Sequence, residues 1–158
     1  MKLKVKRLDK DIPMPRYAKE GDAGFDLRST SAVEIAPGDT VTVGTGLAFE
    51  IPEGYVGLVF PRSGLGSRGV NLANCVGVID SGYRGQVMAP LHNNRKCAIF
   101  TAHGVFDNRA GDGYVRIERG DRVAQMVVVP FATCEFEEVD ELAASERGTG
   151  GFGSSGVM

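Results

Sequence analysis

An alternation of apolar and charged residues runs through LKVKRL, residues 3–8, and this period of two decides the fold class. Successive side chains of a β-strand point to opposite faces, so the alternation predicts a strand with one face in water. Similar short strand-like runs follow at residues 40–43, 55–60, 97–100, 114–117 and 123–129. Many short strands of this kind predict an all-β sandwich or barrel.

Turn residues separate these runs. APGD at residues 36–39 and IPEG at 51–54 place proline and glycine where a type II turn needs them. NN at 93–94 and NRAGDG at 108–113 predict hairpin loops. Strands and helices do not alternate, which argues against a parallel α/β sheet. The helices that we expect are short ones, within 67–73 and 140–145.

Length and charge limit the classes of function. The 158 residues suffice for one domain with one core and leave little room for a second. The chain has 18 lysines and arginines against 20 acidic residues, a formal net charge of −2. A broad basic surface for nucleic acid is therefore not expected, and any polyanion must be bound at a local site.

Membrane and secretory classes are disfavoured as well. No apolar run approaches the roughly 20 residues that cross a bilayer, and the N-terminus lacks the apolar segment of a signal peptide. The three cysteines, Cys75, Cys97 and Cys134, are far apart and lie in apolar segments. This pattern predicts reduced core residues in a cytoplasmic protein.

Two segments in the first half of the chain could bind charged groups. In AGFDLRS, residues 23–29, Asp26 lies between two apolar residues, which by itself indicates a strand with one carboxylate in water. PRSGLGSRG, residues 61–69, combines glycines with Ser63, Arg62 and Arg68. Converging backbone N–H groups with guanidinium groups beside them form a phosphate site. An ordinary glycine-rich turn with solvated arginines explains the segment equally well.

Two later segments carry single polar residues in apolar surroundings. NCVGVIDSGYRG, residues 74–85, is an apolar run that ends in Asp80 and is followed by a turn that presents Tyr83. A carboxylate at a strand end can deprotonate water, and the alternative is an aspartate that caps a turn. In RGDRVAQM, residues 119–126, Gln125 lies within an apolar run. A buried amide must be hydrogen-bonded, either to a ligand or to a neighbouring strand.

RGTGGFGSSG, residues 147–156, is rich in glycine and serine. It lacks the Gly-Lys-Ser/Thr ending of a P-loop and does not lie between a strand and a helix. Such a segment cannot bury a core, so residues 147–158 are expected to be mobile. Its charged and hydroxyl groups could still wrap phosphates, and Phe152 could stack on a base.

Five segments, in their order and spacing over residues 23–156, closely resemble the five motifs of the trimeric dUTPase family. They are AGFDL, PRSGLG, GVIDSGYRG, GDRVAQ and RGTGGFGSSG. The resemblance implies an all-β, distorted jelly-roll protomer of the β-clip type, residues 1–140. A flexible C-terminal arm, residues 141–158, would carry the glycine-rich lid. The resemblance also implies a homotrimer with active sites at subunit interfaces, and a reaction that converts dUTP and water to dUMP and pyrophosphate.

The resemblance implies residue roles by matching position. Asp80 would be the base that activates water for in-line attack on the α-phosphorus, and Asp26 would reach Mg²⁺ through water. Tyr83 would pack beneath the deoxyribose and leave no room for a 2′-hydroxyl. The other implied substrate contacts are Asn74, Gly77 and Val78 for uracil, Arg62, Ser63, Gly64 and Gln125 for the phosphates, and Arg147, Phe152, Ser154, Ser155 and Gly156 in the lid.

Magnesium suits this pattern, because the ion keeps several waters and is held mainly by substrate phosphates. Gln125 would hold either an α-phosphate oxygen or a metal-bound water. The chain departs from the family pattern in two places. Gly82 stands where many members have an acidic residue, and residues 101–113 are longer than the usual connection. We interpret 101–113 as an extended hairpin arm that could contact a protein partner.

Two alternative functions fit parts of the pattern. A dUTPase-like regulatory protein, switched by dUTP, would use the 101–113 arm to bind its partner. A relative of the dCTP deaminases would share the jelly roll, but it needs a glutamate near the base and lacks the RGTGGFG lid. An intact Asp80, Gln125 and Phe152 favour catalysis over simple binding.

Overall fold

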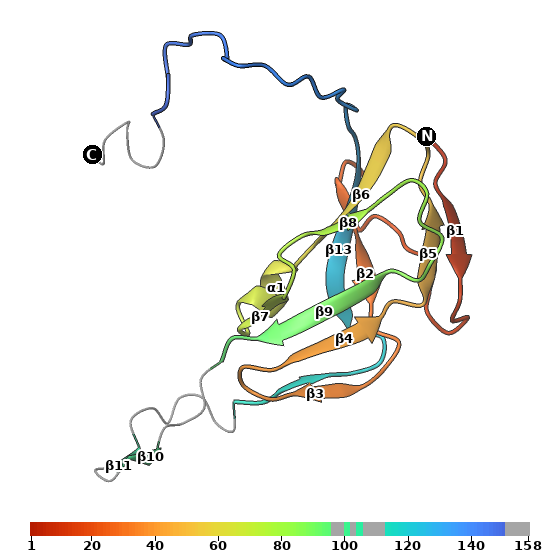
Figure 1. The fold of residues 1–158 in the computed structure, drawn as a ribbon. Helices are drawn as coiled ribbons and strands as arrows, with labels where there is room; N and C mark the ends of the chain where they lie inside the picture. The colour runs from red at the N-terminus through yellow and green to blue at the C-terminus, as the bar shows by residue number, and fades with distance from the viewer. Residues whose placement is uncertain (96–99, 102–103, 106–112, 151–158) are drawn as a thin grey trace.

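The computed structural model describes residues 1–95, 100–101, 104–105 and 113–150, and there the chain consists almost entirely of antiparallel strands (Figure 1). In β2, Phe25 and Leu27 are buried while Asp26 and Arg28 between and beside them are half-exposed, as the alternation requires. The elements in chain order are β1 (Lys4–Arg7), β2 (Gly24–Arg28), β3 (Val33–Ile35), β4 (Thr40–Gly44), β5 (Leu47–Glu50), β6 (Tyr55–Phe60), α1 (Ser63–Gly66), β7 (Val70–Leu72), β8 (Gly77–Ile79), β9 (Met88–Asn93), β10 (Phe100–Thr101), β11 (Gly104–Val105), β12 (Val115–Ile117) and β13 (Arg122–Pro130).

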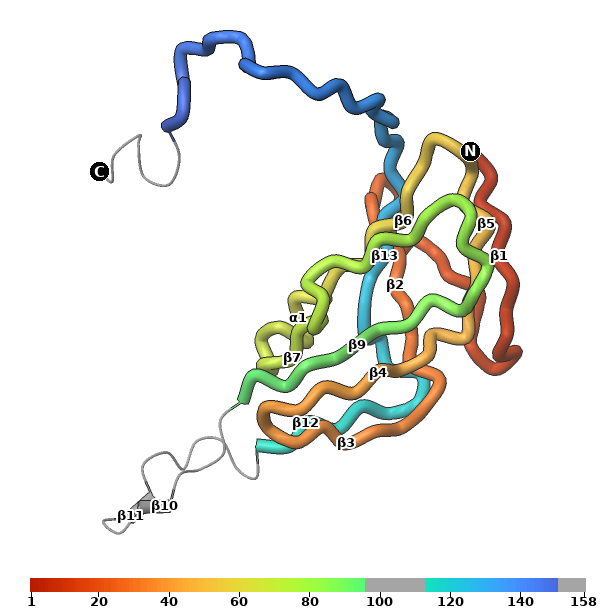
Figure 2. Tube along the Cα trace, in the orientation of Figure 1, coloured from red at the N-terminus to blue at the C-terminus, as the bar shows by residue number. Residues whose placement is uncertain are grey.

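Two sheets form the body of the molecule. One has the strand order β2-β13-β6-β8 and the other the order β4-β9-β7, with β1-β5, β12-β3 and β10-β11 as additional pairs. β13 is central in the larger sheet, where it pairs with β2 on one side and β6 on the other. In Figures 1 and 2, β4 and β9 cross in front of β2 and β13. The non-consecutive strand order brings distant segments of the chain together.

One cluster of apolar side chains joins the two sheets. Leu27 and Met126 come from the larger sheet and Val43, Ala89 and Leu91 from the smaller one, and each is at most 1% exposed. Burial of such side chains is the main favourable contribution to folding. The prediction of an all-β fold is confirmed.

The two predicted helices are wrong. The helix α1 spans Ser63–Gly66, and the expected range 67–73 instead contains β7, which pairs with β9. This long-range pairing overrides the local sequence preference. Residues 140–145 form no helix. They are exposed, and an isolated segment of that length cannot repay the cost of helix nucleation.

The predicted burial of the cysteines is wrong where the structure tests it. Cys75 and Cys134 are exposed free thiols. Cys75 lies in the hairpin between β7 and β8, and Cys134 lies beyond the last strand, so neither segment has a second layer to cover it. Cys97 lies outside the described residues.

Asn93, which the sequence places in a loop, is the fully buried last residue of β9. Its Nδ2 donates to the carbonyl oxygens of Ile35 and Gly113, both at 2.9 Å, and its Oδ1 accepts from the backbone N–H of Arg95 at 3.0 Å. The side chain thus ties three separate segments together. The local pattern could not show this, because two of its partners are far away in the sequence.

Replacement of Asn93 by alanine is expected to lower the free energy of unfolding by about 2–4 kcal/mol, because two buried carbonyls lose their donors. Urea denaturation measures the loss. The neighbouring Asn94 is exposed, so Asn94→Ala serves as the matched control with a change within about 0.5 kcal/mol. Equal stability of the two variants would contradict the assigned role.

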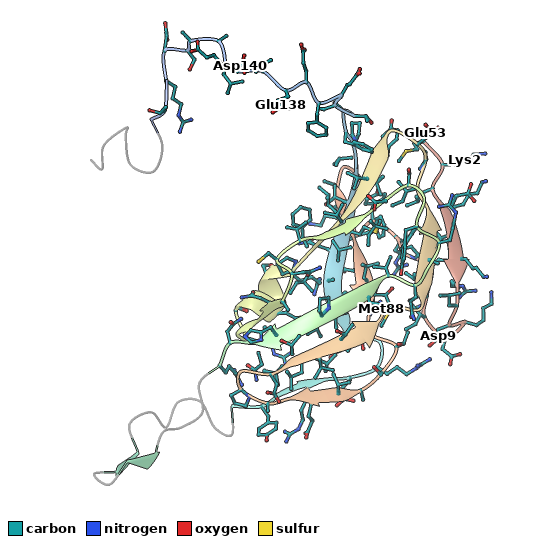
Figure 3. The ribbon with its side chains drawn as sticks, viewed as in Figure 1. Lys2, Asp9, Glu53, Met88, Glu138 and Asp140 are labelled. Atoms are coloured by element: carbon teal, nitrogen blue, oxygen red, sulfur yellow. The ribbon has the colours of Figure 1, made fainter. Side chains whose placement is uncertain are left out.

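Beyond β13 the chain leaves the sheets as an exposed arm, residues 131–150 (Figure 3). Phe136 and Leu142 in this arm are 95% and 89% exposed. The predicted division of the chain at residue 140 stays a prediction. Among the residues that the structure describes, no helix is long and apolar enough to cross a membrane.

Candidate functional site

The register of β13 assembles the first group of predicted site residues. Gln125 is the cross-strand partner of Asp26 on β2 and of Phe60 on β6. Directly opposed residues on neighbouring strands present their side chains on the same face of a sheet. The first, second and fourth motifs therefore meet on one face, although they are far apart in the sequence.

Asp26 is the centre of this group. Arg62 Nε donates to Asp26 Oδ1 at 2.6 Å, and Arg122 Nη1 donates to Oδ2 at 3.3 Å. The side chains of Asp26 and Arg62 are 26% and 25% exposed, so water screens this pair less than it screens a surface ion pair. Gln125 Nε2 donates to the carbonyl of Pro61, the residue that follows β6, at 2.9 Å.

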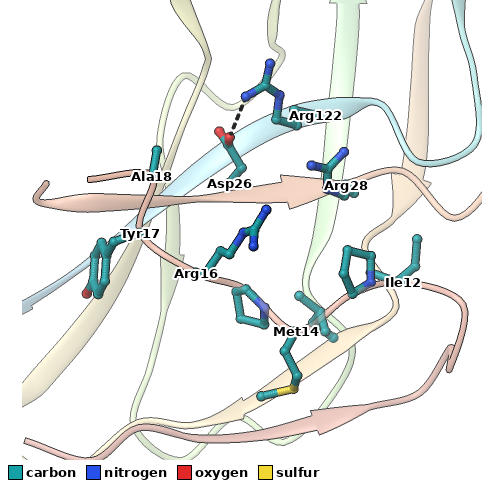
Figure 4. Close-up of a pocket in the computed structure, with 11 residues that line it drawn as sticks. Ile12, Met14, Arg16, Tyr17, Ala18, Asp26, Arg28 and Arg122 are labelled. Atoms are coloured by element: carbon teal, nitrogen blue, oxygen red, sulfur yellow. Dashed lines mark hydrogen bonds and ion pairs between the residues drawn. The ribbon is translucent and has the colours of Figure 1, made fainter. Parts of the chain in front are cut away.

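A cavity of about 470 Å³ opens beside Asp26, and its charged lining consists of Arg16, Arg62 and Arg122 against Asp22 and Asp26. Three cations against two anions favour a negatively charged ligand with an accompanying cation. A larger cavity of about 650 Å³ shares Arg16, Asp26 and Arg122 with it. In Figure 4 the Arg16 side chain points from the 12–18 segment toward β2.

Sequence reasoning missed Arg16 and Arg122. Arg122 lies within the GDRVAQ motif, but strict alternation would place it on the face opposite Gln125. The register of β13 against β2 shifts between Arg122 and Ala124, and the local sequence does not show this irregularity. Arg16 lies outside any regular element, and nothing in its local sequence marks it. Ser63 and Gly64 follow Arg62 at the start of α1, where both are exposed.

Two carboxylates line this cavity, the half-buried Asp26 and the exposed Asp22. Within the described residues, no three of His, Cys, Asp and Glu cluster to form a protein cage for an ion. Mg²⁺ does not need one, since it binds through one or two carboxylates, waters and substrate phosphates. Asp26, with Gln125 beside it, fits this donor set.

The third motif forms a second group. β8 pairs with β6 through Gly57 and Ile79, and Asp80 follows directly at its end. The backbone N–H of Tyr83 donates to the carbonyl of Asp80 at 3.1 Å, which closes the turn. A cavity of about 230 Å³ is lined by Val78, Ile79, Asp80, Tyr83, Gln86, Val87 and Met88.

The hairpin before β8 has a constrained tip. Cys75 has a φ of 60°, in the left-handed region, and its N–H donates to the carbonyl of Leu72 at 3.0 Å. Asn74 is exposed next to it. Gly77 is buried, and a Cβ there would lie 3.2 Å from the Cβ of Val59. The hairpin backbone therefore packs closely on β6, and Asn74 is exposed to solvent.

The lid residues are described only in part. Arg147 is exposed, and its Nε donates to the carbonyl of Gly150 at 2.9 Å. Phe152, Ser154, Ser155 and Gly156 lie outside the described residues. Within one chain, the cavity at Asp26 and the cavity at Asp80 share no lining residue. The structure thus gathers the predicted residues into two separate groups.

A model of the dUTPase family matches residues 10–106 and 105–156. The chain belongs to the dUTPase family. The resemblance predicted from the five motifs is confirmed. A deoxyuridine 5′-triphosphate nucleotidohydrolase of Thermobifida fusca (strain YX) is 43% identical over 157 residues, which cover 99% of this chain and 79% of the relative.

Solved dUTPase structures share the fold. The dUTPase of Staphylococcus bacteriophage 80alpha with dUPNHPP has a TM-score of 0.85 and 36% identity, and the match covers 99% of each chain. That phage dUTPase is described as controlling the transfer of virulence genes by a proto-oncogenic G protein-like mechanism. A mutant dUTPase from phage phi11 of S. aureus, which shows the coordination of a structural Mg(II) ion, has a TM-score of 0.77 and 32% identity. It covers 91% of this chain and 100% of its own.

Proposed function

We propose that this chain is a magnesium-dependent dUTP diphosphatase, which converts dUTP and water to dUMP and pyrophosphate. The observation that carries the proposal is the convergence of Arg62, Arg122 and Gln125 around Asp26 in a chain of the dUTPase family. A triphosphate with a divalent cation complements a cavity that holds both arginines and a carboxylate. Positioning and charge neutralisation are most of what phosphoryl chemistry requires of a protein.

In the proposed mechanism, Arg62, Ser63 and Gly64 hold the phosphate chain. Asp26 would hold Mg²⁺ through water, and the ion when bound supplies charge neutralisation on the phosphate oxygens. Gln125 uses one hydrogen of Nε2 on Pro61, so the second hydrogen and Oε1 are left for an α-phosphate oxygen or for a metal-bound water.

Asp80 acts on the attacking water. Its carboxylate accepts a proton as the water oxygen forms a bond to the α-phosphorus, and the bond from that phosphorus to the pyrophosphate oxygen breaks in line. The exposure of Asp80 at the end of β8 supports this role, because the carboxylate is open to a substrate. Tyr83 packs beneath the deoxyribose, and Asn74 with the backbone at Gly77 and Val78 contacts uracil.

We further propose a homotrimer whose active sites lie between subunits. Two features support it. The two groups of site residues line separate cavities within one chain, as expected if two protomers each supply one group to the same substrate. The arm also exposes apolar side chains, notably Phe136 at 95%, which need a surface to pack against. The lid, with Arg147, Phe152, Ser154, Ser155 and Gly156, would then close over the nucleotide.

The test of the function is pyrophosphate release with magnesium from dUTP, dTTP, dCTP and UTP, with EDTA as the control. Release from dUTP alone, abolished by EDTA, is the expected result. Deamination of dCTP would instead support the deaminase alternative. A folded protein that releases pyrophosphate from none of the four would overturn the enzyme assignment.

The free thiols of Cys75 and Cys134 support a cytoplasmic setting for this reaction.

A regulatory role is a second candidate, favoured by the similarity to the phage 80alpha dUTPase and its described control of gene transfer. The segment 101–113 would be the partner-binding arm. Of this segment, the structure describes Thr101, Gly104–Val105 and Gly113, and the β10–β11 pair joins Phe100 to Val105. Pull-down experiments with and without dUTP test this role, and it requires a partner whose binding depends on the nucleotide.

The conformation of Cys75 gives a prediction for uracil binding. A side chain in the left-handed region costs about 1–2 kcal/mol, and a β-branched one costs more. Cys75→Val is therefore expected to raise the KM for dUTP about fivefold, the factor for roughly 1 kcal/mol. Cys75→Asn, which tolerates this conformation, is the control and should keep the KM. Steady-state kinetics decide between them, and equal KM values would contradict the idea.

A further inference from the structure

The ring of Tyr83 lies directly over Gly85. A Cβ added at Gly85 would come within 2.4 Å of Tyr83 Oη and 2.5 Å of Cζ, closer than real Cβ atoms approach other heavy atoms. Tyr83 Oη also donates to the carbonyl of Gln86 at 2.9 Å. The ring therefore occupies the space that any other residue at position 85 would fill.

Backbone conformation does not explain a glycine at position 85. The φ of Gly85 lies outside the left-handed region in which eight other glycines of the described residues are found. Gly85 is also exposed, so an alanine there meets no core residue. The contact with the Tyr83 ring is what a side chain at position 85 would disturb.

The surroundings hold the ring against this site. Gln86, whose carbonyl accepts the Tyr83 hydroxyl, is itself fixed by its side chain, since Oε1 accepts from the backbone N–H of Gly46 at 2.7 Å. Arg84 Nη1 donates to the carbonyls of Ser81 and Tyr83, at 2.5 and 3.0 Å. These contacts anchor the turn, and Gly85 leaves the space in which the phenol lies.

We propose that Gly85 is a specificity-determining residue of the dUTPase site, because it sets the position of the Tyr83 ring against the sugar. This inference rests on the proposed function, in which Tyr83 packs beneath the deoxyribose. A methyl group at position 85 displaces the phenol from its hydrogen bond with Gln86 and from its contact with the sugar. dUTP loses a fitted contact, so its kcat/KM falls. The kcat/KM for UTP, which the native ring excludes, falls less.

The test is Gly85→Ala, assayed with dUTP and UTP. We expect kcat/KM for dUTP to fall about tenfold, on the scale of a small misplacement of a positioning group. The ratio of kcat/KM for dUTP to that for UTP should fall with it, while the thermal unfolding midpoint is maintained. Gly82→Ala is the matched control, since Gly82 lies in the same turn with nothing within 4 Å of its Cβ position.

A double-mutant cycle separates a positioning role from a general structural one. In the Tyr83→Ala background the methyl group of Gly85→Ala has no ring to displace, so it should cause no further loss. An unchanged ratio of kcat/KM for dUTP to that for UTP, or the same loss in the Tyr83→Ala background, would overturn the inference. A wild-type protein that does not hydrolyse dUTP would overturn the proposed function instead.

Discussion

Asp80→Asn is expected to lower kcat for dUTP by about 10³-fold, the scale of a lost general base. The amide has the shape of the carboxylate but cannot accept the proton of the attacking water. Binding should survive, because the hairpin at Asn74 and the arginines around Asp26 are untouched. Single-turnover kinetics and calorimetric titration with dUPNHPP measure the two effects separately.

The control for this variant is Asp39→Asn, which removes a carboxylate at an exposed turn that lines neither of the two cavities. It should retain wild-type turnover. If Asp80→Asn also loses its affinity for dUPNHPP, Asp80 has a structural role in the turn to Tyr83. Near-normal turnover in Asp80→Asn would remove it as the base.

Deletion of residues 147–158 is expected to lower kcat/KM for dUTP by about 10²-fold, because the lid would no longer exclude water or bring Arg147 to the phosphates. The fold should remain intact. The arm from residue 131 onward is exposed in the described part of the chain, and the core cluster contains no residue from it. Pyrophosphate release and the midpoint of thermal unfolding are the two measurements.

A shorter deletion of Val157 and Met158 lies beyond the glycine-rich motif and serves as the control. It should keep full activity. Near-normal activity after deletion of 147–158 would argue that these residues form no lid. A large loss of stability would show that they pack against another part of the assembly.

Local pattern determined several of the strands. The runs at 3–8, 40–43, 55–60 and 123–129 correspond to β1, β4, β6 and β13. Alternation marks the first two, and short apolar runs bounded by turn residues mark the others. The identities and order of the motif residues also lie in the sequence. They were sufficient to predict the family.

Tertiary structure decided which of these residues meet. The pairing of Gln125 with both Asp26 and Phe60 depends on strand register, and a shift by one residue would turn every side chain to the other face. Local periodicity specifies the faces of a strand but not its neighbours. The ion pairs of Asp26 with Arg62, just beyond β6, and with Arg122, at the register shift of β13, depend on these long-range pairings.

The remaining differences have the same cause. Asn93 is buried, and 70–72 is a strand, because distant segments supply hydrogen-bond partners that no local pattern contains. The contact between Tyr83 and Gly85 depends on how the turn after β8 folds back on itself. The sequence by itself determined the strand class, the motifs and the family, and long-range pairing and packing decided how those residues form the two groups.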